Sequence, residues 1–333
     1  YEPYPSGTMQ DETTLSIRFA RPQGEGPIVA RVIDGGAVAR RLRAQTADGA
    51  AKFLGITSRK PGLGVLLVGN NPASASYVKG KESACAEAGI YTQTIRCSDD
   101  SSQNHLIDII GELNSDVRFD GILVQLPLPP HINEDAVLQA ISPDKDVDGL
   151  HPYNLGLLMV GTPKFVPATP LGVQRLLLEE KIPLRGANIV ICGRSNIVGR
   201  PLAVLLMNKG DNANATVTVC HTGTKDLGAI SRRADVLIAA MGQPSIITGE
   251  MVRPGGVVID VGVSRVADTT RKRGYRLVGD VDFESVAKKA SLITPVPGGV
   301  GPMTIAMLLN NVMIAARTKL SDTDTEILGR QNA

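Results

Sequence analysis

The chain alternates short, continuous apolar runs with segments of helical pattern, and this alternation restricts its fold more than any other feature. The runs favour β-structure and begin after residue 28; in order they read GVLLVG, YTQTIRC, GILVQLPL, NIVICG, ATVTVC, DVLIAA and GVVIDVG. Strands that are apolar throughout and separated by helices form parallel sheets covered on both faces. The sequence therefore predicts an α/β protein built on parallel sheets.

A turn-rich stretch at 142–170 divides these runs into two groups, and a chain of 333 residues is long enough for two domains. We expect a smaller α/β domain at 28–150 and a Rossmann-type parallel-sheet domain at 151–299. The segment 302–320 is predicted to be one apolar helix that returns to pack on the first domain.

The composition excludes several classes of function. Formal net charge is +2, from 35 basic and 33 acidic residues, so the chain has no field strong enough to recruit nucleic acid or an acidic membrane. No apolar run approaches the ~20 residues needed to cross a bilayer. Four cysteines lack metal-ligand spacing, which predicts no metal site and indicates a reducing compartment: Cys85, Cys97, Cys192 and Cys220. We expect a cytoplasmic location, with an organelle as the alternative.

Residues 1–27 are left outside the predicted fold. Four acidic residues in this segment argue against an acid-poor transit peptide: Glu2, Asp11, Glu12 and Glu25. We interpret the segment as an extension or an added leader, with Met9 as an alternative start.

The stretch SASYVKGKES contains two lysines, and the question is which of them is functional. Asn71 suits a helix cap and Pro72 suits a first turn, so 72–88 is predicted to be helical. At about 100° per residue, Tyr77 and Lys81 share one face of this helix.

The same spacing separates the two lysines. Lys79 points about 160° away from Lys81 and is predicted to be solvated. Lys81 lies toward Val78, which together with Cys85 forms the predicted inward face. Taken alone, the spacing also allows both lysines to be ordinary surface residues, as most lysines are.

The segment NIVICGRSNIVGRPLAVLLMNKG places a strand, a turn opening at Gly193 and a helix in that order. This arrangement aims backbone N–H groups and a helix N-terminus at a pyrophosphate. Because Ser195 replaces the second glycine of the G-x-G-x-x-G pattern and Gly199 is one place late, a plain strand-turn-helix is the alternative.

The end of the following strand bears on the choice of cofactor. NAD sites usually carry Asp or Glu there to bind the ribose 2′-hydroxyl, whereas this strand ends in Cys220, His221 and Thr222. No carboxylate repels a 2′-phosphate, and Arg194 is available to pair with one. We therefore predict NADP rather than NAD, and we assign His221 no role in proton transfer.

Two polar residues do not fit their surroundings. Gln125 ends the apolar run GILVQ, where a buried amide without partners costs about 1 to 3 kcal/mol, so it either anchors a turn or faces a site. Asp148, in KDVDGLHP, is either a cap or turn residue before Gly149 or a functional carboxylate. The loop TPVPGGVGPMT either lets backbone approach a ligand closely or is a rigid linker.

Seven motifs occur in one order over roughly residues 28 to 320: YVKGK, GILVQLPLP, SPDKDVDGLHPYN, PATPLGV, GRSNIVGRP, VGDVDF and TPVPGGVGPMTIAMLL. Through them the chain resembles the bifunctional methylenetetrahydrofolate dehydrogenase/cyclohydrolase family. The resemblance implies a homodimer whose subunits each hold a cleft between a folate domain and an NADP domain. It also implies oxidation of 5,10-methylene-tetrahydrofolate to the 5,10-methenyl form and hydrolysis to 10-formyl-tetrahydrofolate, in the one-carbon metabolism that serves purine biosynthesis.

The resemblance assigns roles to residues at matching positions. Lys81 is the expected catalytic lysine, with Tyr77 beside it against the substrate and Gln125 as the partner that tunes the lysine. Asp148 is the expected pterin anchor. The folate side is also expected to include Pro297, Gly298 and Gly299. The expected cofactor-binding residues are Gly193, Arg194, Ser195, Ile197, Gly199, His221, Thr222, Gly242 and Gly301. The chain departs from the family in the insertion MNKGDNANA, which leaves the adenosine side less constrained.

The expected chemistry suits these residue types. Hydride loss from the methylene bridge chiefly needs a nicotinamide placed over the carbon. Hydrolysis needs one group that takes a proton from water and later returns a proton to a ring nitrogen. A lysine qualifies when burial lowers its pKa, which the apolar surroundings of Lys81 and the uncharged Gln125 permit. A carboxylate such as Asp148 accepts two hydrogen bonds from an amino-pyrimidinone edge.

Two other functions compete with this one. Another NADP-dependent dehydrogenase, acting on a hydroxy acid or a shikimate-like substrate, explains the second domain but not the residues of the folate side. The other alternative is a catalytically inactive cofactor-binding protein. Loss of Lys81 or Gln125 would have supported it, but both residues are present.

Overall fold

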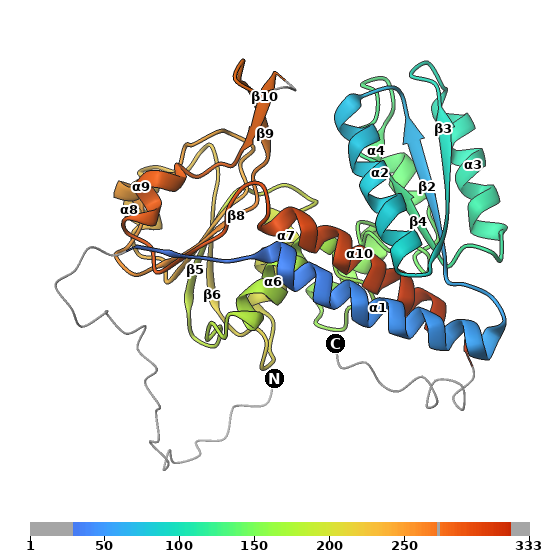
Figure 1. The fold of residues 1–333 in the computed structure, drawn as a ribbon, viewed down its shortest axis with the longest axis horizontal. Helices are drawn as coiled ribbons and strands as arrows, with labels where there is room; N and C mark the ends of the chain where they lie inside the picture. Colours follow the sequence, from blue (N-terminus) through green and yellow to red (C-terminus); the bar gives the residue numbers. More distant parts are fainter. Residues whose placement is uncertain (1–28, 272–273, 321–333) are drawn as a thin grey trace, which may run out of the picture.

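The computed structural model describes residues 29–271 and 274–320, and within them the chain forms two α/β lobes (Figure 1). The first lobe holds a three-stranded parallel sheet in the order β3-β2-β4, with helices on both faces. Its strands are β2 (Gly62–Val68), β3 (Tyr91–Cys97) and β4 (Gly121–Val124), and its helices are α2 (Pro72–Glu87), α3 (Gln103–Ser115) and α4 (Glu134–Gln139). Every residue of β2 and β4 is buried, which explains why their sequences are apolar throughout.

The second lobe holds a six-stranded sheet in the order β1-β11-β8-β7-β5-β6, and all its pairings are parallel. Its strands are β1 (Arg31–Val32), β5 (Asn188–Cys192), β6 (Thr216–Cys220), β7 (Val236–Ala239), β8 (Val257–Asp260) and β11 (Leu292–Ile293). Its helical segments are α7 (Gly199–Met207), α8 (Leu227–Ser231), the 3₁₀ turn η1 (Gly249–Met251) and α9 (Phe283–Ala287). An antiparallel hairpin, β9 (Ser264–Ala267) and β10 (Tyr275–Val278), follows β8 and projects away from the sheet (Figure 1).

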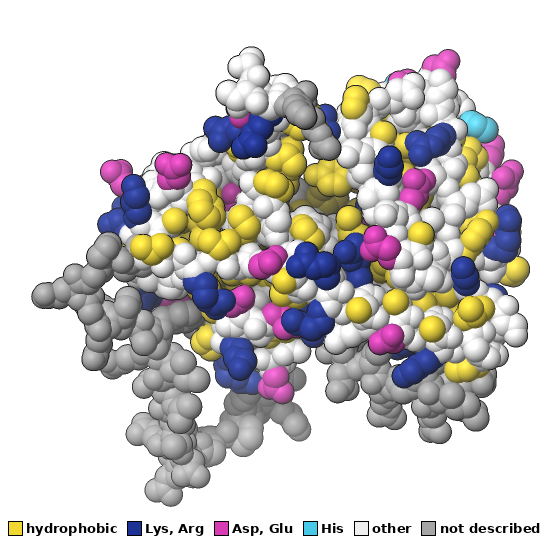
Figure 2. Space-filling view, in the orientation of Figure 1, with side chains coloured by type: hydrophobic (Ala, Val, Ile, Leu, Met, Phe, Trp, Pro, Cys, Tyr) yellow, Lys and Arg dark blue, Asp and Glu magenta, His cyan; other side chains and the backbone are white. Residues whose placement is uncertain are grey.

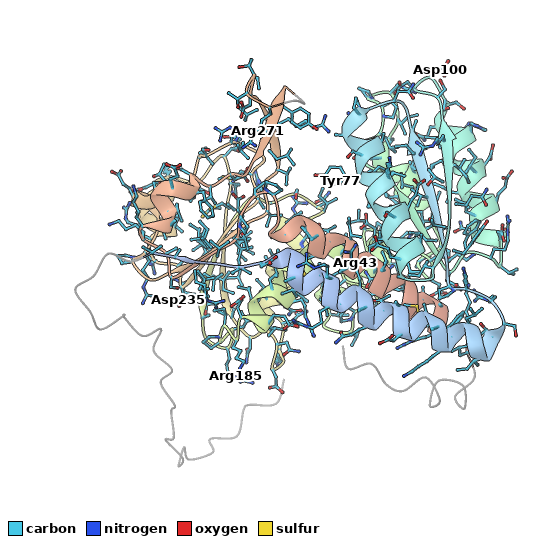
Figure 3. All side chains as sticks on the ribbon, viewed as in Figure 1. Arg43, Tyr77, Asp100, Arg185, Asp235 and Arg271 are labelled. Carbon is cyan, nitrogen blue, oxygen red and sulfur yellow. The ribbon has the colours of Figure 1, made fainter. Side chains whose placement is uncertain are left out.

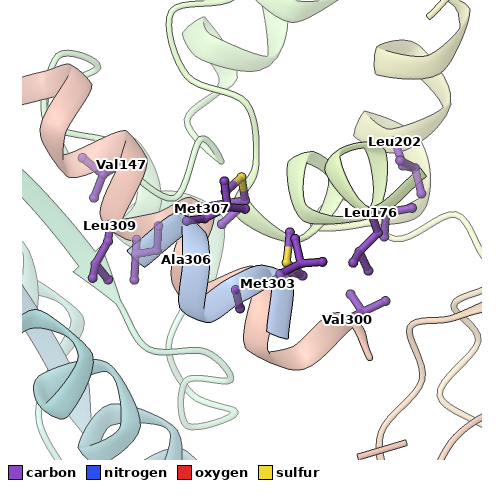
Figure 4. Close-up of a cluster of buried hydrophobic side chains, with 14 of the residues drawn as sticks. Val147, Leu176, Leu202, Val300, Met303, Ala306, Met307 and Leu309 are labelled. Carbon is purple, nitrogen blue, oxygen red and sulfur yellow. The ribbon is translucent and has the colours of Figure 1, made fainter. Parts of the chain in front are cut away.

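Long helices join the lobes: α1 (Gly35–Thr57), α6 (Ala168–Glu179), preceded by α5 (Pro152–Met159), and α10 (Val300–Arg317). α10 packs along both α1 and α6, and α1 and α10 run side by side from one lobe to the other (Figure 1). Figure 4 shows Met303 and Met307 of α10 among buried side chains from other elements, including Leu176 of α6 and Leu202 of α7. By length and composition alone α10 suits a membrane span, but 61% of it is buried inside the protein, as in a core helix.

The structure confirms the α/β class and the parallel sheets, and it differs from the sequence-based boundaries at several points. β1 pairs with β11, so residues 31–32 lie in the second sheet and not in the first domain. The turn-rich stretch at 142–170 contains α5, which was not expected because short helices are weakly marked in a proline- and glycine-rich context. α10 begins at Val300 rather than at 302. The predicted extension, residues 1–27, lies outside the described residues.

The helix that carries the two lysines forms as its sequence predicts. The Asn71 side chain accepts hydrogen bonds from two backbone N–H groups of the first turn, and Pro72 occupies that turn. Val78 and Cys85 are fully buried, whereas Lys79 is exposed. The predicted inward and outward faces of α2 are therefore confirmed.

Candidate active site

A cavity of about 330 Å³ lies between the two lobes. Figure 2 shows a hollow there with hydrophobic side chains around it, and Figure 3 shows Tyr77 pointing from α2 toward the other lobe. The residues that line the cavity are Tyr77, Lys81, Val124, Gln125, Leu126, Asp148, Leu150, Pro167, Ala168, Thr169, Ile197, Val198, Val261, Val263, Val300, Gly301, Thr304 and Ile305. Four of the residues predicted for the folate side, Tyr77, Lys81, Gln125 and Asp148, thus meet at one cavity.

Lys81 and Gln125 form the polar centre of this cavity. The Lys81 Nζ donates a hydrogen bond to Gln125 Oε1 at 3.0 Å. The Gln125 Nε2 donates to the backbone oxygen of Leu126 at 2.7 Å, so the amide oxygen is the atom turned toward the lysine. Because Gln125 directly follows β4, it stands at the carboxyl end of a parallel strand, where α/β proteins place ligands.

The surroundings of Lys81 change its proton affinity. Burial lowers the pKa of Lys81, because removal from water disfavours the ammonium form, while the charge of Asp148 acts in the opposite direction. Burial also raises the pKa of Asp148, and the Lys81 charge opposes that change. A lysine and a carboxyl group of altered proton affinity in one cavity are typical of a site that moves protons.

The loop that carries Asp148 is held from both sides. The Asp146 carboxylate accepts backbone N–H groups at both of its oxygens, from Leu150 at 3.1 Å and His151 at 2.8 Å. The Asn311 Nδ2, on α10, donates to the backbone oxygen of Val147 at 2.9 Å. Neither supporting residue was predicted from the sequence. The carboxylate two positions before Asp148 was an available signal, but nothing local marks an asparagine within α10.

Tyr77 and a pair of threonines complete the walls. The Tyr77 side chain is 47% exposed, so its ring forms the rim of the cavity rather than its floor. The Oγ1 atoms of Thr169 and Thr304 lie 2.9 Å apart and link the first turn of α6 to α10. Both threonines lie in motifs noted above, PATPLGV and GPMTIAM, yet the sequence alone gave them no role.

The second lobe presents a dinucleotide-binding edge next to the cavity. β6 and β7 lie on opposite sides of β5, so the carboxyl end of β5 is the topological switch point of the sheet. Gly193 follows β5 with a φ of 128°, and a Cβ there would lie 2.1 Å from the backbone oxygen of Ala240. Only glycine fits this close approach. The Ser195 Oγ accepts the N–H of Val198 at 3.1 Å as the chain enters α7.

These residues fit a dinucleotide with a 2′-phosphate. The glycine turn leads into the N-terminus of α7, where an anion is favoured. Arg194 and Thr222 are exposed beside it, and no carboxylate follows β6 before Asp226. The His221 Nδ1 accepts the backbone N–H of Gly223 at 3.1 Å, so this histidine has a structural partner.

The remaining predicted residues divide between the cavity and other places. Ile197 and Gly301 line the cavity. Gly242 lies in an exposed loop after β7, on the cofactor edge. Gly298 and Gly299 lie against the start of α1, where the Gly298 backbone oxygen accepts the N–H of Gly36 at 3.0 Å. Together with Pro297, they are not among the residues that line the cavity.

No group of three or more His, Cys, Asp or Glu side chains is placed to hold a metal ion within residues 29–271 and 274–320. The four cysteines are all free thiols.

Comparisons with known proteins agree with this geometry. Residues 33–148 match the profile of the tetrahydrofolate dehydrogenase/cyclohydrolase catalytic domain, and residues 167–320 match that of the NAD(P)-binding domain. The chain is 57% identical over 261 residues to the bifunctional protein FolD of Salinibacter ruber, which covers 78% of this chain and 87% of that one. It is 47% identical to the crystal structure of the bifunctional FolD dehydrogenase/cyclohydrolase from Campylobacter jejuni, with a TM-score of 0.82, covering 87% and 100% of the two chains. The Trypanosoma brucei enzyme complexed with NADP cofactor and inhibitor is 40% identical, with a TM-score of 0.83, covering 87% and 98%.

Proposed function

The chain belongs to the tetrahydrofolate dehydrogenase/cyclohydrolase family, and on that premise we propose how its own residues carry out two successive reactions. The protein oxidises 5,10-methylene-tetrahydrofolate to the 5,10-methenyl form with NADP, and it hydrolyses the methenyl form to 10-formyl-tetrahydrofolate. One observation carries the assignment of the site: the hydrogen bond between Lys81 and Gln125 in a cavity shared with Tyr77 and Asp148.

Asp148 and Tyr77 position the folate. The Asp148 carboxylate accepts hydrogen bonds from the amino-pyrimidinone edge of the pterin, which presents two donors side by side. The ring of Tyr77 lies at the cavity rim, where it packs against the substrate and shields the reacting carbon from bulk water. The two residues come from different elements, so they define both the depth and the orientation of the bound molecule.

Gly193, Arg194 and Ser195 would hold the pyrophosphate and 2′-phosphate of the dinucleotide at the carboxyl end of β5, with Thr222 beside them. When bound, NADP supplies the acceptor for the hydride that leaves the methylene bridge. For this reaction the residues of the chain need to place the folate carbon and to exclude water, and no acid or base is required of them.

Lys81 carries the hydrolysis. Its Nζ takes a proton from the water that attacks the methenyl carbon, and it returns a proton to the ring nitrogen that leaves the carbon. Burial lowers the pKa of Lys81 and so favours the neutral amine, and a neutral amine does not repel the methenyl cation. Gln125 holds Nζ in place without adding a charge.

One assay tests the proposed function. Purified protein is mixed with 5,10-methylene-tetrahydrofolate and NADP, and the methenyl chromophore is followed as it rises and then decays to the 10-formyl product. A chromophore that rises and persists would support the dehydrogenase activity and contradict the cyclohydrolase activity. A chromophore that never forms would contradict both.

We also propose that the protein is a homodimer that acts in the cytoplasm. The dimer rests on the family resemblance, and the location rests on four free thiols, which suit a reducing compartment. Sedimentation equilibrium across a range of protein concentrations tests the dimer. A monomeric mass at micromolar concentration would contradict the proposed dimer. Fractionation of the source cells tests the location.

A further inference from the structure

Two buried carboxylates of the second lobe take no part in the reactions described so far. Asp260 is the last residue of β8 and is 3% exposed, and Asp280 follows β10 and is fully buried. A buried carboxylate is costly unless it is well hydrogen-bonded, so each should have a definite set of partners. The partners of both are backbone N–H groups, and they lead to the cofactor edge.

Asp280 fixes the loop that follows β7. Its Oδ2 accepts the backbone N–H groups of Met241 at 2.5 Å and Gly242 at 3.0 Å, and its Oδ1 accepts that of Gln243 at 2.8 Å. Three consecutive amides thus converge on one side chain. Gly242 and Gln243 are themselves exposed, so this part of the loop is surface that a buried side chain holds from beneath.

Asp260 in turn fixes the segment that carries Asp280. Its Oδ1 accepts the backbone N–H of Asp280 at 3.0 Å, and its Oδ2 accepts that of Val281 at 3.0 Å. The approach is close enough that a Cβ at Gly279 would lie 1.8 Å from Asp260 Oδ2. The two carboxylates therefore connect three segments in series. Asp260 at the end of β8 bonds to the segment after β10, and Asp280 in that segment bonds to the loop after β7.

The loop held by Asp280 directly follows Ala240, and Ala240 contacts the glycine turn. The backbone oxygen of Ala240 packs against Gly193, the residue that opens the proposed phosphate turn. The Asp260 Oδ1 also accepts the N–H of Gly262 at 3.0 Å, between Val261 and Val263, which line the cavity. The Asp280 link therefore ends next to the glycine turn proposed for the dinucleotide, and the Asp260 link ends beside two residues that line the cavity.

We propose that Asp280 is a positioning residue for the dinucleotide. Asp280 fixes the backbone of residues 241–243 at the cofactor edge, and Asp260 fixes the backbone position of Asp280. This inference rests on the proposed binding of NADP at that edge. An Asn side chain has one oxygen, and its NH₂ group would face a backbone N–H, so Asp280→Asn must lose at least one of the three contacts. The loop then relaxes while the folate side keeps all its residues.

The test separates binding of the dinucleotide from the rest of the enzyme. The Kd for NADP is measured by titration calorimetry for wild type and Asp280→Asn, and methenyl hydrolysis is measured without NADP. We expect the Kd to rise about tenfold, as for loss of a hydrogen bond to a charged group, with hydrolysis within about twofold of wild type. An unchanged Kd overturns the proposal, and so does a loss of hydrolysis as large as the loss of NADP affinity.

Asp235→Asn is the matched control. Asp235 also accepts a backbone N–H of the same sheet, from Asn188 at 2.9 Å, but at the amino ends of the strands, away from the cofactor edge (Figure 3). The control should leave the Kd for NADP within about twofold. A rise in Kd equal to that of Asp280→Asn would show that general loosening of the lobe is responsible, and would overturn the proposal.

A measurement on the unmodified protein covers the case in which Asp280→Asn does not fold. Hydrogen exchange of the amides of Met241, Gly242 and Gln243 is followed with and without saturating NADP. The proposal expects slow exchange despite surface exposure, and slower exchange when NADP is bound. Fast exchange in both conditions overturns it. If wild-type protein does not bind NADP at all, the proposed function fails as well, and calorimetry reports that outcome separately.

Discussion

The Lys81 Nζ lies 3.0 Å from Gln125 Oε1, which joins the middle of α2 to the end of β4. An amide partner satisfies the buried amine without stabilising its positive charge as a carboxylate would. Asp148, the carboxylate whose charge acts on the lysine, lies in the same cavity but has no direct hydrogen bond to it among the described contacts. With an uncharged partner, the pKa of the lysine stays lowered by burial, which suits a group that takes up and releases protons.

Lys81→Met should abolish most of the methenyl hydrolysis, by about 100-fold or more, because a general acid–base group typically contributes at least that factor. The dehydrogenase reaction should fall less, since it needs placement of the folate more than a base. Steady-state rates of both reactions, with spontaneous hydrolysis subtracted, provide the measurement.

Lys79→Met is the control for this prediction, because Lys79 is an exposed lysine on the opposite face of the same helix. It should leave both rates within about twofold, as surface substitutions usually do little. Equal loss of both activities in a folded Lys81 variant would remove the assigned role. Collapse of hydrolysis in the Lys79 variant would move that role to the other lysine.

The extent to which this site could be predicted from sequence depends on the distance between partners. The helical period of α2 was enough to turn Lys81 inward and Lys79 outward, because both residues lie in one regular element. Gln125 was marked by its position at the end of an apolar run. Asp260 and Asp280 were not predicted, because their link exists only when β8 and the segment after β10 meet in the folded chain.

The fold shows the same division. Parallel sheets followed from continuous apolar strands separated by helices, whereas β1 was not predicted as a strand because two residues carry no periodic signal. The pairing of β1 with β11 joins residues that are about 260 positions apart in the chain. Such long-range pairing depends on tertiary structure rather than on local propensity.

Asp148→Asn should weaken folate binding by about 10- to 100-fold, which corresponds to about 1.5 to 3 kcal/mol for a hydrogen bond to a charged group. Binding of NADP should stay within about twofold. Separate calorimetric titrations measure both. Asp144→Asn is the control, because Asp144 is 77% exposed on the same loop and pairs only with Lys164 among the described salt bridges. Unchanged folate affinity in Asp148→Asn would show that this residue only stabilises the turn and does not bind the pterin.

The pH dependence of hydrolysis should move in a defined direction in Asp148→Asn. Hydrolysis needs the neutral amine, so its rate should rise as pH rises through the pKa of Lys81 and then level off. The Asp148 charge raises the pKa of Lys81 against the larger effect of burial, so its removal should lower that pKa further. The rising limb should therefore shift to lower pH at saturating substrate. A shift to higher pH would contradict the assigned coupling.

NADP should be preferred over NAD, and Arg194 should account for much of the preference. Arg194→Gln should reduce kcat/KM for NADP by about 10- to 100-fold, since a charge-assisted contact to a phosphate is lost, with little change for NAD. Arg200→Gln is the control: Arg200 is also exposed, and its Nη1 bonds to Asn196 at 2.7 Å within the same segment. Equal kcat/KM for both cofactors in the wild type would defeat the prediction.

The stability of the protein should fall as pH rises from about 4 to about 7, in part because of Asp260. Burial raises the pKa of Asp260 to about 7, with the neighbouring Asp280 charge adding to the effect, and backbone hydrogen bonds oppose it. The unfolded carboxyl group keeps its ordinary value near 4. Between these values the folded chain binds more protons than the unfolded chain, so the free energy of unfolding decreases with rising pH and becomes independent of this group above about 7.

Asp260→Asn removes this contribution at every pH, because an amide does not ionise in this range. The substitution lowers stability by loss of backbone contacts, so the informative quantity is how the difference between variant and wild type changes with pH. Guanidinium unfolding at pH 5 and pH 8 should show the variant gaining about 2 to 3 kcal/mol on the wild type between the two conditions. A difference that stays constant, or that moves against the variant, would show that Asp260 remains ionised in the folded protein throughout, held by its three backbone N–H partners.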